Sequence, residues 1–216
     1  MVFFADRVDA GKHLASALKN LVDKDAIVLA IPRGGVVVGY EVAKALGLPL
    51  DVIIPRKIRA PSNPELAIGA MTEDGTVLLD EILIERLQVP NYYIKEESAA
   101  QKLEIQRRLK LYRGDFPYPS LANRDVILVD DGIATGSTMK AALASVRKRG
   151  AKTVVVAIPV GPSSTIMELE RKANRVVCLY TPESFYAIGQ FYRDFTQTND
   201  EEVTRLLKFI KKQRGD

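Results

Sequence analysis

Five short aliphatic runs, each about the length of a buried strand, alternate with segments of helical periodicity. The runs are AIVLAI, LDVIIP, DVILV, TVVVAIP and RVVCLY, at residues 26–31, 50–55, 125–129, 153–159 and 175–180. Apolar residues recur at helical spacing in residues 6–22, 36–46, 137–149 and 163–173. This alternation predicts an α/β fold with a parallel sheet covered on both faces, in which ligands bind at the carboxyl ends of the strands.

One region departs from this alternation. Residues 66–72 and 76–79 are typical of a hairpin around Glu-Asp-Gly, and residues 80–113 form a long, charged helical pattern that ends at FPYPS. We expect a single domain, residues 1–216, with residues 80–120 as a mainly helical inserted hood over the ligand-binding edge. A last helix is expected at residues 200–212.

Composition excludes several kinds of site. Lys and Arg number 31 and Asp and Glu 27, spread along the chain, so the net charge of +4 does not form a polybasic tail. With one Cys and one His, the chain cannot form an internal disulfide or a zinc site built from Cys and His. We expect Cys178 to be a buried apolar residue and His13 a surface or helix-packing residue. No run of about 18 apolar residues occurs, so we expect a cytoplasmic protein without a membrane span.

The stretch VILVDDGIATGSTM, residues 126–139, carries an acidic pair at the end of a predicted strand. Asp130 and Asp131 directly follow four aliphatic residues that should be buried. Two unpaired carboxylates in an apolar core would cost roughly several kcal/mol. We therefore expect both at the ligand-binding edge, where they can accept hydrogen bonds from vicinal hydroxyls or hold a divalent cation.

The segment after the acidic pair is suited to holding a phosphate. Residues 134–138 open a helix, whose free N–H groups and partial positive charge favour an anion. Thr135, Ser137 and Thr138 add hydroxyl donors, and Gly136 lets the backbone come close. The P-loop pattern and the GxGxxG pattern are both absent. We call residues 134–138 the phosphate cup. Carboxylates that can bind a diol, next to this cup, indicate a ribose 5-phosphate site. The alternative is an ordinary capped strand-to-helix turn.

The stretch VILVDDGIATGST resembles the phosphoribosyl diphosphate (PRPP) signature of type I phosphoribosyltransferases, although Gly132 replaces the usual aliphatic residue after the acidic pair. The resemblance implies that Asp130 and Asp131 bind the ribose 2′- and 3′-hydroxyls. It also implies that Mg²⁺, carried by PRPP, meets these two aspartates indirectly. The 5′-phosphate would be held by Ala134, Thr135, Gly136, Ser137 and Thr138.

A second segment, AIPRGG at residues 30–35, resembles the diphosphate loop of the same family. Pro32, Arg33, Gly34 and Gly35 would bind diphosphate, since the glycines let main-chain amides approach and the guanidinium offers two donors. The resemblance also implies a cis peptide bond between Pro32 and Arg33. Taken alone, the same residues could form a simple turn before a helix.

A third segment, RKIRAPSNPE at residues 56–65, resembles the flexible catalytic loop of the family. In that interpretation Arg56, Lys57 and Arg59 stabilise the leaving diphosphate, and Glu65 is an acid or base. Closure of such a loop would exclude water from a reactive sugar cation. The alternative is a solvated basic loop.

A fourth segment, TPESFYAIGQFYRDF at residues 181–195, resembles the base-binding tail of purine phosphoribosyltransferases. Phe185 is the candidate that stacks on the base, and Arg193 the candidate that reaches diphosphate. These aromatic residues could equally pack the protein interior.

The resemblance implies a Mg²⁺-dependent phosphoribosyltransferase that joins the 5-phosphoribosyl group of PRPP to a purine or related base, works as a homodimer and does not act on nucleic acid. Ala134 stands where family enzymes for 6-oxopurines carry an acidic residue, so the acceptor base stays open. The alternative is a regulator that binds PRPP without catalysis and contacts nucleic acid through the basic segment KLEIQRRLKLYRGD, residues 102–115.

Overall fold

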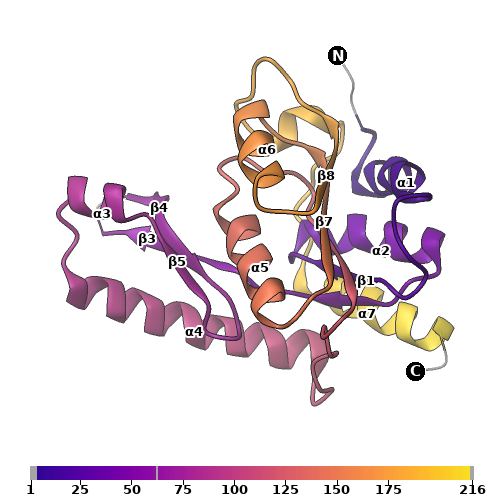
Figure 1. The fold of residues 1–216 in the computed structure, drawn as a ribbon, viewed down its shortest axis with the longest axis horizontal. Helices are drawn as coiled ribbons and strands as arrows, with labels where there is room; N and C mark the ends of the chain where they lie inside the picture. The colour runs from indigo at the N-terminus through magenta and orange to yellow at the C-terminus, as the bar shows by residue number, and fades with distance from the viewer. Residues whose placement is uncertain (1–3, 62, 215–216) are drawn as a thin grey trace.

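The computed structural model describes residues 4–61 and 63–214, with the side chains at positions 64, 65, 211, 213 and 214 left undescribed. Its centre is a parallel sheet in the order β2-β1-β6-β7-β8 (Figure 1). The strands are β1 (Ile27–Ala30), β2 (Leu50–Val52), β6 (Asp125–Val129), β7 (Thr153–Val160) and β8 (Arg175–Tyr180). The predicted α/β class and each of the five predicted strands are confirmed.

Helices cover both faces of this sheet. Figure 1 shows α1 (Arg7–Leu18) and α2 (Gly34–Leu46) on one face and α5 (Ser137–Lys148) and α6 (Ser163–Glu170) on the other. The alternate side chains of β1 explain this arrangement, because Val28 and Ala30 join one buried cluster while Ile27 and Leu29 join the other. The last helix, α7 (Asp200–Arg214), packs on α2. Both faces are thus apolar, as the uninterrupted aliphatic runs predict.

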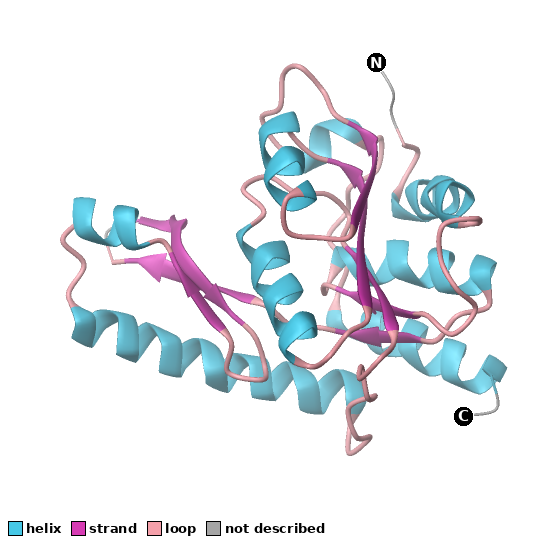
Figure 2. Ribbon diagram, in the orientation of Figure 1, coloured by secondary structure: helices cyan, strands magenta, loops and turns pink. Residues whose placement is uncertain are grey.

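A second sheet stands beside the first. It is antiparallel, in the order β3-β4-β5, and contains β3 (Arg56–Ala60), β4 (Asn63–Met71) and β5 (Val77–Leu79). It carries two helices, α3 (Glu81–Arg86) and α4 (Asn91–Arg113), and Figure 2 shows these elements as a body projecting from the core. We call residues 56–113 the antiparallel lobe. Buried Ile58, Ile68 and Ile105 fill the space between its sheet and α4.

The predicted hairpin at residues 66–79 is confirmed, but the interpretation of residues 56–65 as a loop is wrong. Arg56 to Ala60 pair with β4 as a strand. The reason is an apolar alternation that the basic residues conceal, since Ile58 and Ala60 are buried while Lys57 and Arg59 point outward.

Cys178 and His13 have the structural surroundings that the sequence predicts for non-catalytic residues. Cys178 is partly buried, its thiol donates to the carbonyl oxygen of Tyr180 at 3.3 Å, and burial raises the pKa of the thiol to about 11. His13 is an exposed residue on α1, with Nε2 3.5 Å from Asp9 Oδ1. None of the helices in the described ranges combines the length and the apolarity that a membrane span requires.

Candidate functional site

A cavity of about 430 Å³ opens where β1 and β6 end and where β3 begins. Its walls come from segments that are far apart in the sequence, and nine of the predicted site residues lie in them: Pro32, Arg33, Gly34, Arg56, Lys57, Arg59, Asp130, Asp131 and Thr138. The cavity is therefore at the carboxyl edge of the parallel sheet, where ligands of such folds bind.

The loops after β1 and β6 form one side of the cavity, and we call residues 31–35 and 130–138 the core rim. The main-chain N–H of Ile31 donates to the carbonyl oxygen of Val129 at 2.9 Å, which carries the parallel pairing to the ends of both strands. The peptide bond between Pro32 and Arg33 is cis, as the resemblance implied.

Two glycines allow the core rim to close. A Cβ atom on Gly34 would overlap the carboxylate of Asp131, and one on Gly35 would lie 2.9 Å from the Cα atom of Asp130. A larger residue at Gly35 would push the two loops apart, whereas one at Gly34 would displace the Asp131 carboxylate from Arg7. The pattern PRGG and the pattern DDG thus depend on each other in space, although they are far apart in the sequence and only the sheet brings them together.

The two carboxylates of the core rim are partly buried next to each other. Asp130 Oδ1 accepts a hydrogen bond from the main-chain N–H of Asp131 at 2.8 Å. Burial and the neighbouring carboxylate raise the pKa of Asp130 well above its ordinary value. Burial also raises the pKa of Asp131, but the guanidinium of Arg7 opposes that rise. This pair therefore favours a ligand that supplies positive charge or hydroxyl donors.

Arg7, at the start of α1, is a site residue that sequence reasoning missed. Its Nε lies 2.7 Å from Asp131 Oδ2, and its NH1 donates to the carbonyl oxygen of Thr196 at 2.8 Å. The guanidinium lies over the ring of Phe195, 3.9 Å from the centroid. Tyr192 completes the contact by donating from its hydroxyl to the carbonyl oxygen of Asp131 at 2.6 Å. No local sequence signal relates Arg7 to an aspartate 124 positions away.

The predicted phosphate cup forms the turn into α5. Gly136 is the N-cap residue and has a left-handed backbone with φ 69°, which only glycine adopts readily. Thr165 supports the turn from below, since its hydroxyl donates to the carbonyl oxygen of Ala134 at 2.7 Å. Thr135 and Ser137 share a hydrogen bond of 3.1 Å. The first N–H groups of α5 have no partner within the helix and are available to an anion.

Six basic side chains line the cavity. Two are paired, Arg7 with Asp131 and Arg108 with Glu104, whose atoms lie 2.7 Å apart in each pair. Across the described part of the chain, no carboxylate lies within ion-pair distance of the other four: Arg33, Arg56, Lys57 and Arg59. Cations gathered without a directly paired carboxylate attract an anion into the space between them.

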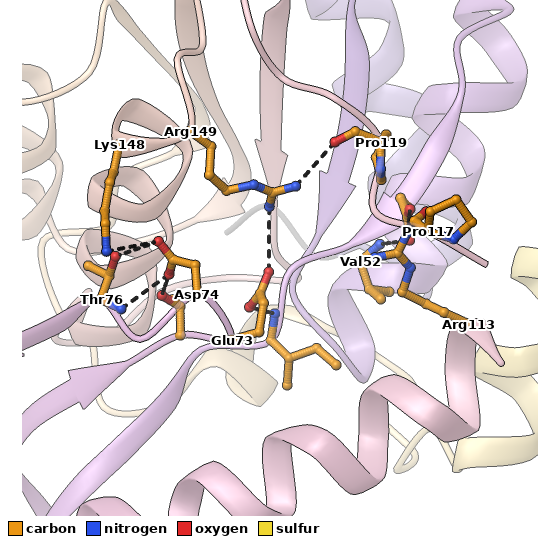
Figure 3. Close-up of polar contacts among 12 residues, drawn as sticks. Val52, Glu73, Asp74, Thr76, Arg113, Pro117, Pro119, Lys148 and Arg149 are labelled. Atoms are coloured by element: carbon orange, nitrogen blue, oxygen red, sulfur yellow. Dashed lines mark hydrogen bonds and ion pairs between the residues drawn. The ribbon is translucent and has the colours of Figure 1, made fainter. Parts of the chain in front are cut away.

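Polar contacts hold the start of β3 against the core. Glu73, in the β4–β5 turn, has a side chain that is only 2% exposed. One carboxylate oxygen accepts a hydrogen bond from the main-chain N–H of Ile54 at 3.1 Å, and the other lies 3.6 Å from Arg149 NH1 (Figure 3). Burial raises the pKa of Glu73, although these contacts oppose the rise. Because Ile54 is two residues from Arg56, this anchor sets where the basic strand begins.

Phe185 and Arg193 lie away from the cavity. Phe185 stacks on Phe191, with ring centroids 5.5 Å apart and planes at 29°, and Arg193 is exposed and donates its main-chain N–H to Phe4. Glu65 belongs to β4, but its side chain lies outside the described residues. The tail residues that line the cavity are Ile188, Phe195, Gln197 and Thr198.

The acidic pair by itself is too small a ligand set for a resident metal ion. Within the described ranges, no group of three or more His, Cys, Asp or Glu side chains could hold one. Mg²⁺ prefers several water or phosphate oxygens together with one or two carboxylates. Asp130 and Asp131 therefore fit a Mg²⁺ ion that arrives bound to a ligand.

Comparison with known proteins gives concordant matches. A family model described as the phosphoribosyl transferase domain matches residues 5–196. Proteins of two Mycobacterium tuberculosis strains, provisionally named phosphoribosyl transferases, are each 44% identical over 207 residues, which is 96% of this chain and 47% of theirs. The chain thus spans about half the length of these curated relatives. The crystal structure of TT1426 from Thermus thermophilus is 42% identical, has a TM-score of 0.81, and is matched over 96% of this chain and 98% of that one.

Proposed function

Because the chain belongs to the phosphoribosyl transferase domain family, we propose that it transfers the 5-phosphoribosyl group of PRPP to a nitrogenous base and releases diphosphate. The base is a purine or a related ring. The proposal extends to a homodimer, which light scattering can test.

The observation that carries this proposal is the separation of charge across one cavity. The two carboxylates of the core rim lie on one side, and four basic side chains without carboxylate partners among the described residues lie around the rest. PRPP has the complementary pattern, with hydroxyl donors on its ribose and dense negative charge on its diphosphate. Electrostatic complementarity of this kind favours one orientation of the ligand.

The roles of the residues follow from this orientation. Asp130 and Asp131 would accept hydrogen bonds from the ribose hydroxyls, and the turn at residues 134–138 would hold the 5′-phosphate. Arg33 and the amides at Gly34 and Gly35 would bind the diphosphate. Ile188 and Phe195 line the cavity and are better placed to contact the base than Phe185, whose ring is stacked on Phe191.

Displacement at the anomeric carbon needs alignment and charge stabilisation more than a nucleophile from the protein. The base nitrogen forms the new C1′–N bond and gives its proton to water, while the C1′–O bond breaks and its electron pair leaves with the diphosphate oxygen. Arg56, Lys57 and Arg59 would stabilise that growing negative charge, and the acidic pair would keep the ribose aligned. Asp130 and Asp131 would hold a Mg²⁺ ion that arrives with PRPP, and this ion would neutralise part of the charge on the departing diphosphate.

The distribution of basic residues on α4 supports an enzyme over a nucleic-acid-binding regulator. Arg108 turns toward the cavity, and Arg113 is buried with NH2 3.0 Å from Asp51 Oδ2. These two side chains are therefore not available to a phosphate backbone. A broad basic face along this helix, which the alternative needs, is correspondingly reduced.

Calorimetry with Mg²⁺ and PRPP tests the binding step. The wild-type chain should bind PRPP, and Asp130→Asn/Asp131→Asn should reduce the affinity by about 100-fold or more, since two charge-assisted contacts are lost. Asp23→Asn/Asp25→Asn removes the same charge from an exposed loop and should bind as the wild type does. Failure of the wild-type protein to bind PRPP would refute the proposal.

Incubation with PRPP, Mg²⁺ and a panel of purines and pyrimidines tests the transfer step. Release of diphosphate with one base, together with formation of the matching nucleotide, is the expected result. Tight binding of PRPP without turnover for any base would favour the non-catalytic regulator instead.

A further inference from the structure

The inward face of α4 is polar where it meets β3. Glu97, Gln101, Glu104 and Arg108 follow one another at intervals of four, three and four residues, which places them on one side of the helix. Gln101 is only 6% exposed and is one of few buried polar residues of the described chain. A buried amide needs partners for both of its ends, so its contacts bear on why it is there.

Both ends of the Gln101 amide are used, and one of them holds Arg56. Gln101 Oε1 accepts a hydrogen bond from Arg56 Nε at 2.8 Å, and Gln101 Nε2 donates to Glu97 Oε1 at 2.9 Å. The same Glu97 oxygen accepts the main-chain N–H of Arg59 at 3.4 Å. A single turn of α4 is therefore connected to the guanidinium of Arg56 and to the backbone of β3.

The chemistry of this partner matters. A carboxylate at the same place would hold the guanidinium more strongly, but it would also cancel its charge. The amide fixes one edge of the guanidinium and carries no charge. The terminal amino groups of Arg56, NH1 and NH2, make no hydrogen bond or ion pair to any described residue, and Arg56 lines the cavity.

We propose that Gln101 is a positioning residue, which orients Arg56 so that its terminal amino groups meet the diphosphate while no carboxylate pairs directly with its guanidinium. This inference rests on the proposed function, because it concerns the ligand of that same cavity. It also assigns α4 a role in the site: the helix holds the basic strand at a set distance and angle from the core rim.

Two substitutions separate orientation from charge. Gln101→Glu keeps an acceptor for Arg56 Nε, but it adds a negative charge and replaces the donor to Glu97 by a second carboxylate, so we expect diphosphate to bind about tenfold more weakly at pH 8. Gln101→Met fills similar space without an acceptor, and we expect a loss of about threefold to fivefold. Gln106→Glu adds the same charge to an exposed position on the same helix, and we expect less than a twofold change.

The pH dependence gives a result that a merely structural role would not produce. The carboxyl group that Gln101→Glu introduces is neutral when protonated, so the ratio of the affinity of this variant to the wild-type affinity should recover toward one as the pH falls from 8 to 5. The ratio for Gln101→Met should stay constant over the same range. Comparison at each pH removes the titration of diphosphate itself, which affects all variants equally.

Calorimetry with inorganic diphosphate as the probe distinguishes the outcomes. If the wild-type chain does not bind diphosphate, the proposed function is at fault. If the wild type binds and Gln101→Glu binds equally well at pH 8, Gln101 does not act through Arg56 and the inference is wrong. Thermal unfolding shows which variants are folded, and Gln101→Asn, a shorter neutral amide, replaces Gln101→Glu if that variant does not fold. The Asn side chain is too short to bring its amide to Arg56, so diphosphate should bind more weakly, and unchanged binding would overturn the inference.

Discussion

The two sides of the cavity are built in different ways. The core rim follows the backbone: parallel strands end side by side, and glycines let the loops at residues 31–35 and 130–138 touch. The opposite side consists of long basic side chains on β3, one of which is oriented by a helix 45 positions further along the chain. We call Arg56, Lys57, Arg59 and Arg108 the lobe rim. Close packing tolerates little added volume, whereas the attraction between separated charges falls gradually with distance and salt. Substitutions in the core rim should therefore reduce ligand affinity more than substitutions in the lobe rim.

Among single substitutions that change ligand affinity, the strongest effect is expected for Gly34→Ala in the core rim. The new methyl group would overlap the carboxylate of Asp131 and displace it from its contact with Arg7. We expect PRPP affinity to fall about 100-fold, the equivalent of roughly 3 kcal/mol. Gly47→Ala is the control, because nothing lies near its added Cβ atom, although the left-handed backbone there, with φ 68°, strains an alanine. If calorimetry shows equal PRPP affinity for both variants, close packing at Gly34 does not shape this rim.

Neutralising the lobe rim should have a smaller, salt-sensitive effect. Lys57→Gln and Arg59→Gln each remove an exposed charge at the cavity, and we expect losses of about threefold to tenfold in diphosphate affinity at low salt. Since the screening length is about 10 Å at 0.1 M salt, these losses should shrink as salt is added. Lys24→Gln, an exposed charge in the loop before β1, serves as the control. If the losses of affinity do not change with salt, the basic side chains of this rim act through steric fit and not through charge.

Arg7→Gln tests the link between the core rim and α1. Burial raises the pKa of Asp131 and Arg7 opposes this, so the variant should titrate at a higher pH than the wild type. A carboxyl group with a raised pKa loses its contribution to stability as the pH rises. The unfolding free energy of the variant should therefore fall relative to the wild type between pH 4 and pH 8. Carboxyl ¹³C NMR and urea denaturation measure the two quantities, and an unchanged Asp131 midpoint would contradict the pairing.

Glu73→Gln tests how the antiparallel lobe is fastened to the core. Burial raises the pKa of Glu73, so its ionisation costs stability as the pH rises above the ordinary value of 4.5. Gln has no such cost. The unfolding free energy of the wild type should decrease relative to the variant from pH 4.5 upward. Glu85→Gln, at an exposed position on α3, should leave the pH profile parallel to that of the wild type.

The smallest effect is expected at Lys148, which lies beside the same anchor. Lys148 Nζ is 3.6 Å from Asp74 Oδ2, and the side chain is 61% exposed. Lys148→Ala should cost less than about 0.5 kcal/mol. Arg149→Ala, one residue further, should cost about 3 kcal/mol, because it leaves the carboxylate of Glu73 buried without its cation. If chemical denaturation gives the same loss of unfolding free energy for both variants, burial does not determine the strength of these ion pairs.

Sequence reasoning was most successful where one segment contains all the information. The five parallel strands, the β4–β5 hairpin and the cis peptide bond after Pro32 are confirmed. It failed at β3, because basic residues on the outer face hide a buried alternation at Ile58 and Ala60. The roles assigned to the acidic pair, the basic residues and the base-binding tail stay predictions, although the cavity contains most of these residues.

The sequence by itself determined where the five parallel strands and the helices between them lie along the chain, and it identified the two loops of the core rim. Aliphatic runs, acidic pairs and glycines act through the local backbone, which is why one segment suffices. Only the tertiary structure decided that Arg7 faces Asp131, that Gln101 holds Arg56, and that Arg108 turns inward. Arg7, Gln101 and Arg108 lie on helices whose local sequence resembles that of any amphipathic helix. Packing of the helices against the two sheets brings them together, and no local pattern records the distance between segments that meet only in the folded chain.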